Sequence, residues 1–208
     1  MEDVLEVYHR PYDPQRPVVC LDEQPVQLIG ETRVPIAVAP GRPARFDYEY
    51  VRNGTANLFI LTEPLAGWRY VEVTDRRTAV DFAQLLRLLA EDIHPEAQKI
   101  VLVMDNLNTH KLASLYQAFP PALARRLAER FEIHYTPKHG SWLNVAEIEL
   151  SVLARQCLGR RLDSVALLKA EVAAWQSQRN ASADRVVWRF TAADARIKLR
   201  HLYPVILE

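Results

Sequence analysis

The sequence predicts an α/β fold in which helices flank a mixed central sheet, made of a three-strand antiparallel meander plus parallel strands. Short apolar runs rich in β-branched residues alternate with amphipathic helical patterns, which is the order expected of a sheet covered by helices. The chain has 208 residues, 49% of them hydrophobic, so it can bury an ample core. We therefore expect one domain, or one domain with a small appendage.

The first predicted strand is the apolar run "RPVVCLDE" (16–23), which ends on Asp22 and Glu23. Its residue types are typical of a strand buried on both faces. The stretch that follows, Gln24–Pro43, holds too many prolines for a regular helix or a central strand. Long excursions of this kind are usually functional, although a loop that only packs on the surface is an equal alternative.

The next two elements complete the predicted meander. Residues 44–64 alternate aromatic and acidic side chains, turn at Asn53-Gly54 and resume as an apolar run, a pattern that predicts an antiparallel hairpin. Residues 67–75, "GWRYVEVTD", predict the third strand.

The second half of the chain alternates helices with strands. Apolar residues at helical spacing predict an amphipathic helix over 78–93, which leads into the buried strand "KIVLVMD" (99–105). The remaining predicted elements are helices over 112–119 and 121–131, a strand over 132–135 and a helix from about Asn144 to Leu158. The predicted order is β-β-β-α-β-α-β-α.

Three carboxylates are predicted to meet at one edge of this sheet. Asp22 closes the first strand, Asp105 closes the strand after the first long helix, and Glu147 lies in the first turn of a later helix. A lone acid at a strand end is more often a cap or a loop residue, but three acids on a converging topology favour a shared site. Oxygen ligands of this kind suit two Mg²⁺ ions, with Mn²⁺ as a substitute, that assist phosphoryl transfer.

Two neighbouring acids are rivals for the same role. Glu149 lies two positions after Glu147, which on a helix turns its side chain about 200° away. Glu23 alternates to the opposite side of its strand from Asp22. We therefore expect neither to bind the ions, and we expect Glu23 to be a supporting or loop acid.

The motifs that carry these acids resemble those of the DDE superfamily transposases, in particular the bacterial insertion-sequence branch related to the mariner group. The resemblance rests on "CLDE", "MDNLNTH" and "YTPKHGSWLNVAEIELSVL", and it spans nearly the whole chain. It implies a ribonuclease H-like fold, with the three acids as the catalytic ligands of two Mg²⁺ ions. The interval between Asp105 and Glu147 is longer than is usual in mariner relatives, and the helical patterns within it would absorb the extra length.

The resemblance also implies an activity and its partners. The activity is metal-dependent cleavage of DNA phosphodiesters at transposon ends, followed by strand transfer into target DNA, commonly at a TA dinucleotide. The partners would be the inverted-repeat ends and the target DNA, held by a homodimer that forms on the DNA. No apolar run approaches the roughly 20 residues of a membrane span, so we expect a cytoplasmic protein associated with the bacterial nucleoid.

Relatives of this kind carry an N-terminal helix-turn-helix region, whereas this chain starts a few residues before its first catalytic strand. We therefore expect residues 1–16 to be a linker tail from a missing DNA-binding region. Residues 17–208 would then be the catalytic domain with a C-terminal helical extension. The position of the Pro-rich stretch Gln24–Pro43 after the first strand resembles that of the clamp loop in mariner transposases, which bridges subunits in the DNA complex, so we expect the stretch to contact a second subunit or the DNA it holds.

Cationic, amide and aromatic side chains near the acids and in the Pro-rich stretch are candidates for DNA contact. They are Arg33, Arg42, Arg45, Asn106, His110, Lys111, Lys138, His139, Trp142 and Asn144. His110 is at least as well explained as a histidine that fixes its own loop, and packing beneath the loop is favoured for Trp142 over stacking on a base. Lys138 has a stronger functional case, because its charge complements a phosphate.

Charge and cysteine content narrow the classes of protein further. The formal net charge is +0, which argues against a nonspecific basic nucleic-acid binder, although basic residues are in excess from Arg155 to Arg200. That excess fits a phosphate-binding surface and a solvated helical face equally well. Cys20 and Cys157 match no metal-ligand or redox spacing, so we expect two reduced, buried thiols.

Three alternative functions remain. A standalone ribonuclease H-like nuclease would share the acids but cut without joining. A domesticated, noncatalytic DNA-binding protein would keep the fold without metal dependence, yet all three acids are intact. An unrelated α/β phosphotransferase would normally offer a glycine-rich phosphate loop, and this chain has 6 Gly with no such loop.

Overall fold

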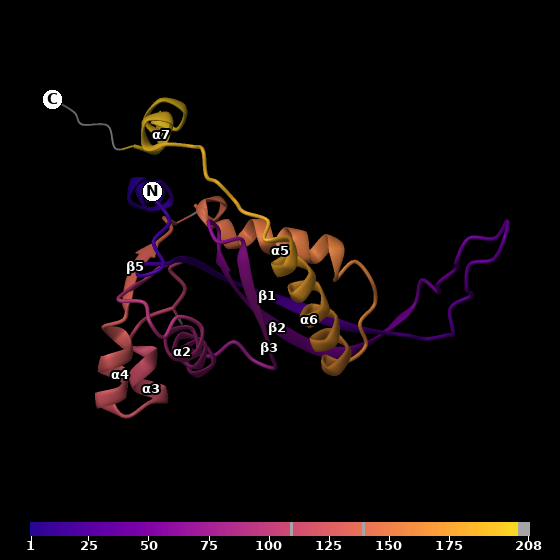
Figure 1. The fold of residues 1–208 in the computed structure, drawn as a ribbon. Helices are drawn as coiled ribbons and strands as arrows, with labels where there is room; N and C mark the ends of the chain where they lie inside the picture. The colour runs from indigo at the N-terminus through magenta and orange to yellow at the C-terminus, as the bar shows by residue number, and fades with distance from the viewer. Residues whose placement is uncertain (109, 139, 204–208) are drawn as a thin grey trace.

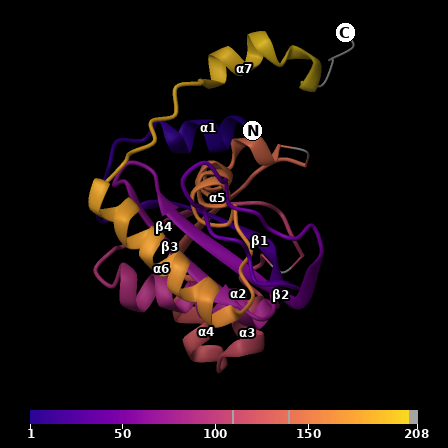
Figure 2. The same ribbon diagram turned by 90° about the vertical axis from the view of Figure 1, so that its right-hand side faces the viewer.

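The chain folds as a five-stranded sheet with helices on both faces (Figures 1 and 2), in a computed structural model that describes residues 1–108, 110–138 and 140–203. The strands are β1 (Val18–Glu31), β2 (Tyr50–Glu63), β3 (Trp68–Thr74), β4 (Ile100–Met104) and β5 (Phe131–Tyr135). The α-helices are α1 (Glu2–Tyr8), α2 (Ala79–Leu88), α3 (Ser114–Ala118), α4 (Pro121–Ala128), α5 (Val145–Gln156), α6 (Val165–Ser182) and α7 (Ala192–Lys198). Short π or 3₁₀ helices are η1 (Leu89–Ile93), η2 (Ser141–Leu143) and η3 (Arg200–Leu202).

The sheet has the order β3-β2-β1-β4-β5. β1, β2 and β3 form an antiparallel meander, and β4 and β5 run parallel to β1. This is the mixed sheet that the sequence predicts. The predicted helix that leads into β4 is also present as α2 and η1, and it begins at a capping box between Thr78 and Asp81.

Side chains of the sheet alternate between two hydrophobic cores. Val19 and Leu21 of β1 pack with α2, α3 and α4, whereas Cys20 packs with α1, α5 and α6 on the opposite face. The same alternation holds in β4, where Val103 faces the α5 side and Met104 the α2 side. The position of a residue along a strand therefore decides which layer of helices its side chain can meet.

The predicted hairpin turn at Asn53-Gly54 is wrong. β2 runs through both residues without reversing, and its pairing with β1 is irregular between Gln27 and Ile29, opposite this point. Gly54 has a φ of 103°, which suits glycine in a β-bulge as well as in a turn. The dipeptide alone does not distinguish the two.

β1 does not end at the acids but continues to Glu31, and with β2 it extends into a long arm (Figure 1). The end of this arm, residues 32–49, is an open loop with isolated backbone bridges. Pro25 is accommodated within β1 because the pairing with β4 stops at Cys20, beyond which β1 continues with β2.

The N-terminal residues correct another expectation, since residues 1–16 do not form a linker tail throughout. Residues 2–8 form α1, whose apolar face is buried in the same core as α5 and α6. Val4 and Leu5 are fully buried there. The hydroxyl of Tyr8 donates to the carbonyl of Leu143 at 2.7 Å, so α1 also touches the segment that precedes α5.

The C-terminal extension consists of α6 and α7, and α7 lies against α1 (Figure 2). Arg196 forms an ion pair with Glu2 at 2.6 Å. Trp188, which precedes α7, packs on Tyr8 with ring centroids 5.3 Å apart. The two ends of the described chain therefore hold each other in place.

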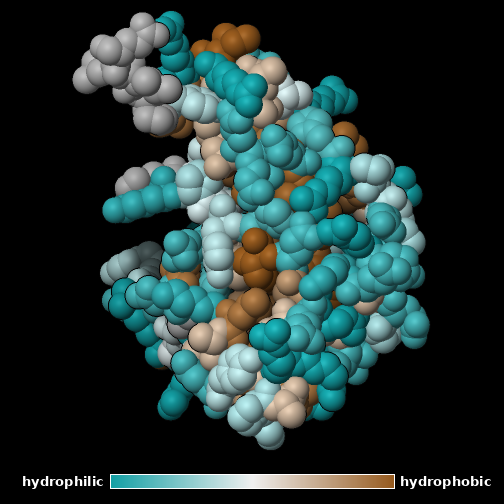
Figure 3. Space-filling view, turned by 90° about the vertical axis from the view of Figure 1, so that its left-hand side faces the viewer, coloured by the Kyte–Doolittle hydropathy of each residue, from teal (hydrophilic) through white to brown (hydrophobic). Residues whose placement is uncertain are grey.

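Polar side chains dominate the surface and apolar side chains the interior. The face in Figure 3 is largely hydrophilic, with hydrophobic side chains in a limited area. Cys20 and Cys157 are free and buried, as predicted. None of the described helices has the length and apolar character that crossing a membrane requires.

The burial of α1 predicts a measurable contribution to folding. Leu5→Ala leaves a cavity in the core beneath α5 and α6, so the free energy of unfolding falls by about 2–5 kcal/mol. Glu6→Ala, on the exposed side of the same helix, changes it by no more than about 0.5 kcal/mol. Urea denaturation measures both, and equal effects would show that α1 is not part of the cooperative core.

Candidate active site

The candidate site lies where β1 and β4 stop pairing. Their parallel pairing ends at Cys20↔Val103. Asp22 follows two residues later in β1, and Asp105 directly follows the last residue of β4. Asp22 shares the strand parity of Cys20, which faces the α5 layer, so its carboxylate is directed toward the helix that carries Glu147, whose charge acts on it.

Asn144 holds the first turn of α5, which contains Glu147, next to β1 near Asp22. Its Oδ1 accepts a hydrogen bond from the N–H of Ala146 at 3.1 Å and so caps the helix. Its Nδ2 donates to the carbonyl of Leu21 at 2.8 Å, next to Asp22. The structure contradicts the predicted DNA contact by Asn144, because this side chain is buried with both ends of its amide bonded.

The acids interact electrostatically. Burial raises the pKa of Asp22 to about 7, and the negative charges of Glu147, Asp105 and Glu23 act in the same direction, against a hydrogen bond from the N–H of Glu23. A carboxylate held in such surroundings is stabilised by a proton or by a cation. The site therefore favours a positively charged ligand.

The donor chemistry of the three acids fits hard divalent ions, because Mg²⁺ and Mn²⁺ prefer carboxylate oxygens. Among the residues that the structure describes, no three His, Cys, Asp or Glu side chains already form a closed metal-binding group. Metal binding by the three acids therefore stays a prediction.

His110 links the second acid to the first strand. Its Nδ1 lies 2.5 Å from Oδ1 of Asp105, and its Nε2 lies 2.6 Å from Oε2 of Glu23, which also pairs with Arg77 at 3.6 Å. Burial by itself would lower the pKa of His110, but the bonds to these two carboxylates and their charges raise it to about 9. The bond from His110 in turn lowers the pKa of Asp105.

This arrangement corrects one prediction and agrees with two alternatives. The side chain of His110 is 1% exposed, so the structure contradicts its predicted DNA contact and favours a histidine that fixes its own loop. Glu23 is held by His110 and Arg77, which agrees with a supporting rather than a metal-binding role.

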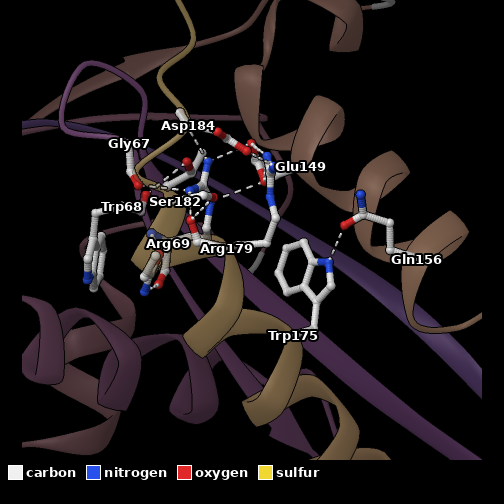
Figure 4. A network of polar contacts seen from close by, with 11 residues as sticks. Gly67, Trp68, Arg69, Glu149, Gln156, Trp175, Arg179, Ser182 and Asp184 are labelled. Carbon is white, nitrogen blue, oxygen red and sulfur yellow. Dashed lines mark hydrogen bonds and ion pairs between the residues drawn. The ribbon is translucent and has the colours of Figure 1, made fainter.

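Glu149 is engaged in a buried ion network on the other side of α5 (Figure 4). It accepts two hydrogen bonds from Arg69, at 2.9 and 3.1 Å, and two from Arg179, at 3.1 and 3.4 Å. Arg69 and Glu149 are each 1% exposed, and Arg69 also donates to the carbonyl of Asp184. This confirms that Glu149 does not share the side of the helix on which Glu147 lies.

The remaining candidates for DNA contact lie mostly on the surface. Those that are exposed are Arg33, Arg42, Arg45, Asn106, Lys111 and Lys138. Trp142 is 42% exposed and stacks on Trp188 with ring centroids 6.4 Å apart, so one side of it is packed. His139 lies outside the described residues. Contact of any of these with DNA stays a prediction.

Two buried residues, Arg69 and Tyr8, hold α5 in place, and the sequence around them gives little or no indication of this role. Arg69 is a cation inside the strand pattern "WRYVEVT", and such a residue needs a buried partner that the local pattern does not name. Tyr8 donates to the carbonyl of Leu143 and accepts from the N–H of Val145, at 2.7 and 3.3 Å. No local pattern marks Tyr8 for this role.

Comparison with known proteins gives a family and a fold. Residues 17–169 match the family described as DDE superfamily endonuclease. No curated protein is a significant sequence match. The structure resembles crystal structures of mariner Mos1, and this likeness confirms the predicted ribonuclease H-like fold.

The similar structures include the Mos1 mariner paired end complex with Mn (20% identity, TM-score 0.57), which the chain matches over 88% of its own length and 56% of that chain. The Mos1 strand transfer complex is 18% identical with a TM-score of 0.59, and the match covers 88% of this chain and 55% of that one. The mariner Mos1 paired end complex with Mg is 21% identical with a TM-score of 0.56, and the match covers 96% of this chain and 58% of that one. The chain thus spans little more than half the length of these Mos1 chains.

Two substitutions on α5 separate the acid of the candidate site from the acid of the ion network. Glu149→Gln leaves the buried Arg69 without a carboxylate, while Arg179 keeps its ion pair with Asp184, so the free energy of unfolding falls by about 3–5 kcal/mol. Glu147→Gln removes one of several repelling charges, so the loss stays below about 1 kcal/mol. Urea denaturation without metal measures both, and similar losses would contradict the separation.

Proposed function

The chain belongs to the DDE superfamily endonucleases, and from that premise we propose that it is the catalytic domain of a mariner-related transposase from a bacterial insertion sequence. In this role it hydrolyses phosphodiesters at transposon ends and transfers the cut strand into target DNA. The observation that carries the proposal is the approach of Asp22, Asp105 and Glu147 at the point where β1 and β4 part. The likeness in fold to Mos1 paired end and strand transfer complexes supports it.

The three acids act as ligands of two Mg²⁺ ions, for which Mn²⁺ substitutes. When bound, the ions supply activation of the attacking oxygen and charge stabilisation of the leaving oxygen. The chain holds the acids in place by strand pairing up to Cys20, by the bond of Asn144 to β1 and by the bonds of His110. The Mn and Mg in two of the similar Mos1 complexes support this choice of ions.

The DNA backbone meets exposed polar side chains beside the acids. Asn106 and Lys111 belong to the loop that follows Asp105, and Lys138 belongs to the loop that leads to α5. Lysine side chains at these places neutralise phosphates, and amide groups donate to phosphate oxygens. They therefore orient the scissile strand across the carboxylates.

The arm formed by β1 and β2 reaches a second subunit or the DNA that this subunit holds. Its end is rich in exposed apolar side chains: Val34, Ile36, Val38, Phe46 and Tyr48. It also carries the exposed cations Arg42 and Arg45, whose planar donors suit phosphates or a partner's carboxylates. Such a surface on a projecting loop favours an interface, which supports a homodimer on DNA. Integration at TA is part of the proposal through the resemblance to mariner transposases alone.

This function places the protein on bacterial DNA in the cytoplasm. A standalone nuclease that cuts without joining would use the same acids, so strand transfer is the reaction that distinguishes the two. The substrate is DNA that carries precleaved transposon ends, and the product is a joined strand.

Asp105→Asn keeps the fold, because the amide oxygen still accepts from His110, but it lowers the rates of cleavage and strand transfer at least about a thousandfold. Loss of a metal ligand removes several kcal/mol of transition-state stabilisation, and each 1.36 kcal/mol is about a factor of ten in rate. Single-turnover assays with Mn²⁺ measure both rates, and circular dichroism measures the fold.

Asp92→Asn is the matched control, since Asp92 is an exposed acid in η1, which leads to the start of β4, whereas Asp105 follows the other end of that strand. It should cut and join at the wild-type rate. Near-wild-type activity of the Asp105 variant would contradict the assignment, whereas cutting without joining by the wild-type protein would favour the standalone nuclease.

Replacing residues 34–46 by a short Gly-Ser linker should leave the fold and Mn²⁺ binding intact, because the segment adds no side chain to the hydrophobic cores. Assembly of two transposon ends should be lost, because the proposed contact to the second subunit is removed. Light scattering of the complex with end DNA measures the assembly. A shortened protein that still pairs two ends and joins them normally would show that the arm is only a surface loop.

A further inference from the structure

His110 lies in the space that opens where β1 and β4 part. The backbone ladder ends at Cys20↔Val103, so beyond that point it no longer fixes the distance between Asp105 and β1. His110 follows Asp105 in the loop after β4, and its side chain reaches back into this opening. A buried side chain in this opening can link β1 to the residues after β4, where backbone hydrogen bonds between the two strands are absent.

The two ring nitrogens of His110 bridge carboxylates from different strands. One bond goes to Asp105 after β4 and the other to Glu23 in β1, at 2.5 and 2.6 Å. By strand parity Glu23 faces the α2 side, where the ring of Phe82 packs on the imidazole with centroids 5.0 Å apart. Arg77 pairs with the other oxygen of Glu23, so the link is anchored on the α2 side as well.

The loop backbone is held without the imidazole. The hydroxyl of Tyr135 donates to the carbonyl of His110 at 2.9 Å. The N–H of His110 donates to the carbonyl of Leu107 at 3.0 Å. The imidazole adds to these backbone contacts two bonds that tie the loop to the carboxylates of Asp105 and Glu23.

We propose that His110 is a positioning residue that holds the carboxylate of Asp105 at a set distance from β1, and thereby sets the affinity of the site for divalent ions. The inference rests on the proposed function, which assigns Asp105 as a metal ligand. The side chain of Asp105 is 36% exposed whereas that of His110 is 1% exposed, so the carboxylate is open on one side while bonded on the other. Removal of such a partner of a metal ligand typically weakens metal binding or activity by about 10–100-fold.

The test compares His110→Phe, which keeps a ring beside Phe82 but removes both bonds, with His110→Gln, which keeps one donor. Calorimetric titration of the metal-free protein with Mn²⁺ gives the affinity, and urea denaturation gives the stability. His110→Phe should raise the Kd for Mn²⁺ by at least about tenfold, and His110→Gln should recover part of this loss. Cleavage rates at subsaturating Mn²⁺ should be highest in the wild type, lower in His110→Gln and lowest in His110→Phe.

Phe82→Leu is the control for a merely structural role. It loosens the core beside the imidazole without touching either carboxylate, so it should lower stability and leave the Kd for Mn²⁺ unchanged. Equal weakening of Mn²⁺ binding in Phe82→Leu and His110→Phe would overturn the proposal, because general loosening would then explain both.

Crystal structures of metal-free wild type and His110→Phe separate this inference from the proposed function. A displaced Asp105 carboxylate in the variant supports positioning by His110, whether or not the protein cuts DNA. An unchanged carboxylate, or an unchanged Kd for Mn²⁺, overturns it. A wild-type protein that binds no Mn²⁺ and cuts no DNA would instead overturn the proposed function.

Discussion

The end of the β1–β4 ladder at Cys20↔Val103 is the constraint on which the candidate site depends. Up to that pair, backbone hydrogen bonds hold two buried strands at a fixed spacing. Past it, β1 continues with β2 while β4 ends, and the acids occupy the opening. Like charges gathered there repel one another, and the raised pKa of Asp22 reflects both this repulsion and burial. Asn144 and His110 oppose the separation, because each bonds a neighbouring segment to β1 or to its acid.

Helix α5 keeps a structural carboxylate, Glu149, apart from the proposed metal ligand Glu147 within three residues. Glu149 lies among Arg69 and Arg179, where removal of one partner would leave a buried charge. Glu147 lies at the opposite side of the helix, in its first turn, where the positive end of the helix dipole favours a carboxylate. The ion network therefore fixes the rotation of α5, and with it the direction in which Glu147 points.

Local patterns were sufficient to predict most elements and to single out the three acids of the candidate site. Buried strands and amphipathic helices show different hydrophobic periods, so the strand before Asp105 and the helix over 78–93 are visible without tertiary information. An acid that directly follows an apolar strand is equally visible, because burial changes abruptly there. The rotation of Glu149 away from Glu147 follows from helix geometry alone.

What sequence alone determined was the order of elements and the residues able to carry chemistry, since both depend on neighbours along the chain. Only the tertiary structure decided which elements meet. Gly54 suits a turn or a bulge, and the pairing of β2 with the extended β1 selects the bulge. His110 is polar and follows an acid, which predicts that it can contact DNA. In the folded protein its second nitrogen instead bonds Glu23, a residue distant in sequence. The apolar residues Val4, Leu5, Val7 and Tyr8 of α1 do have helical spacing, but that pattern does not say against which distant segments they pack.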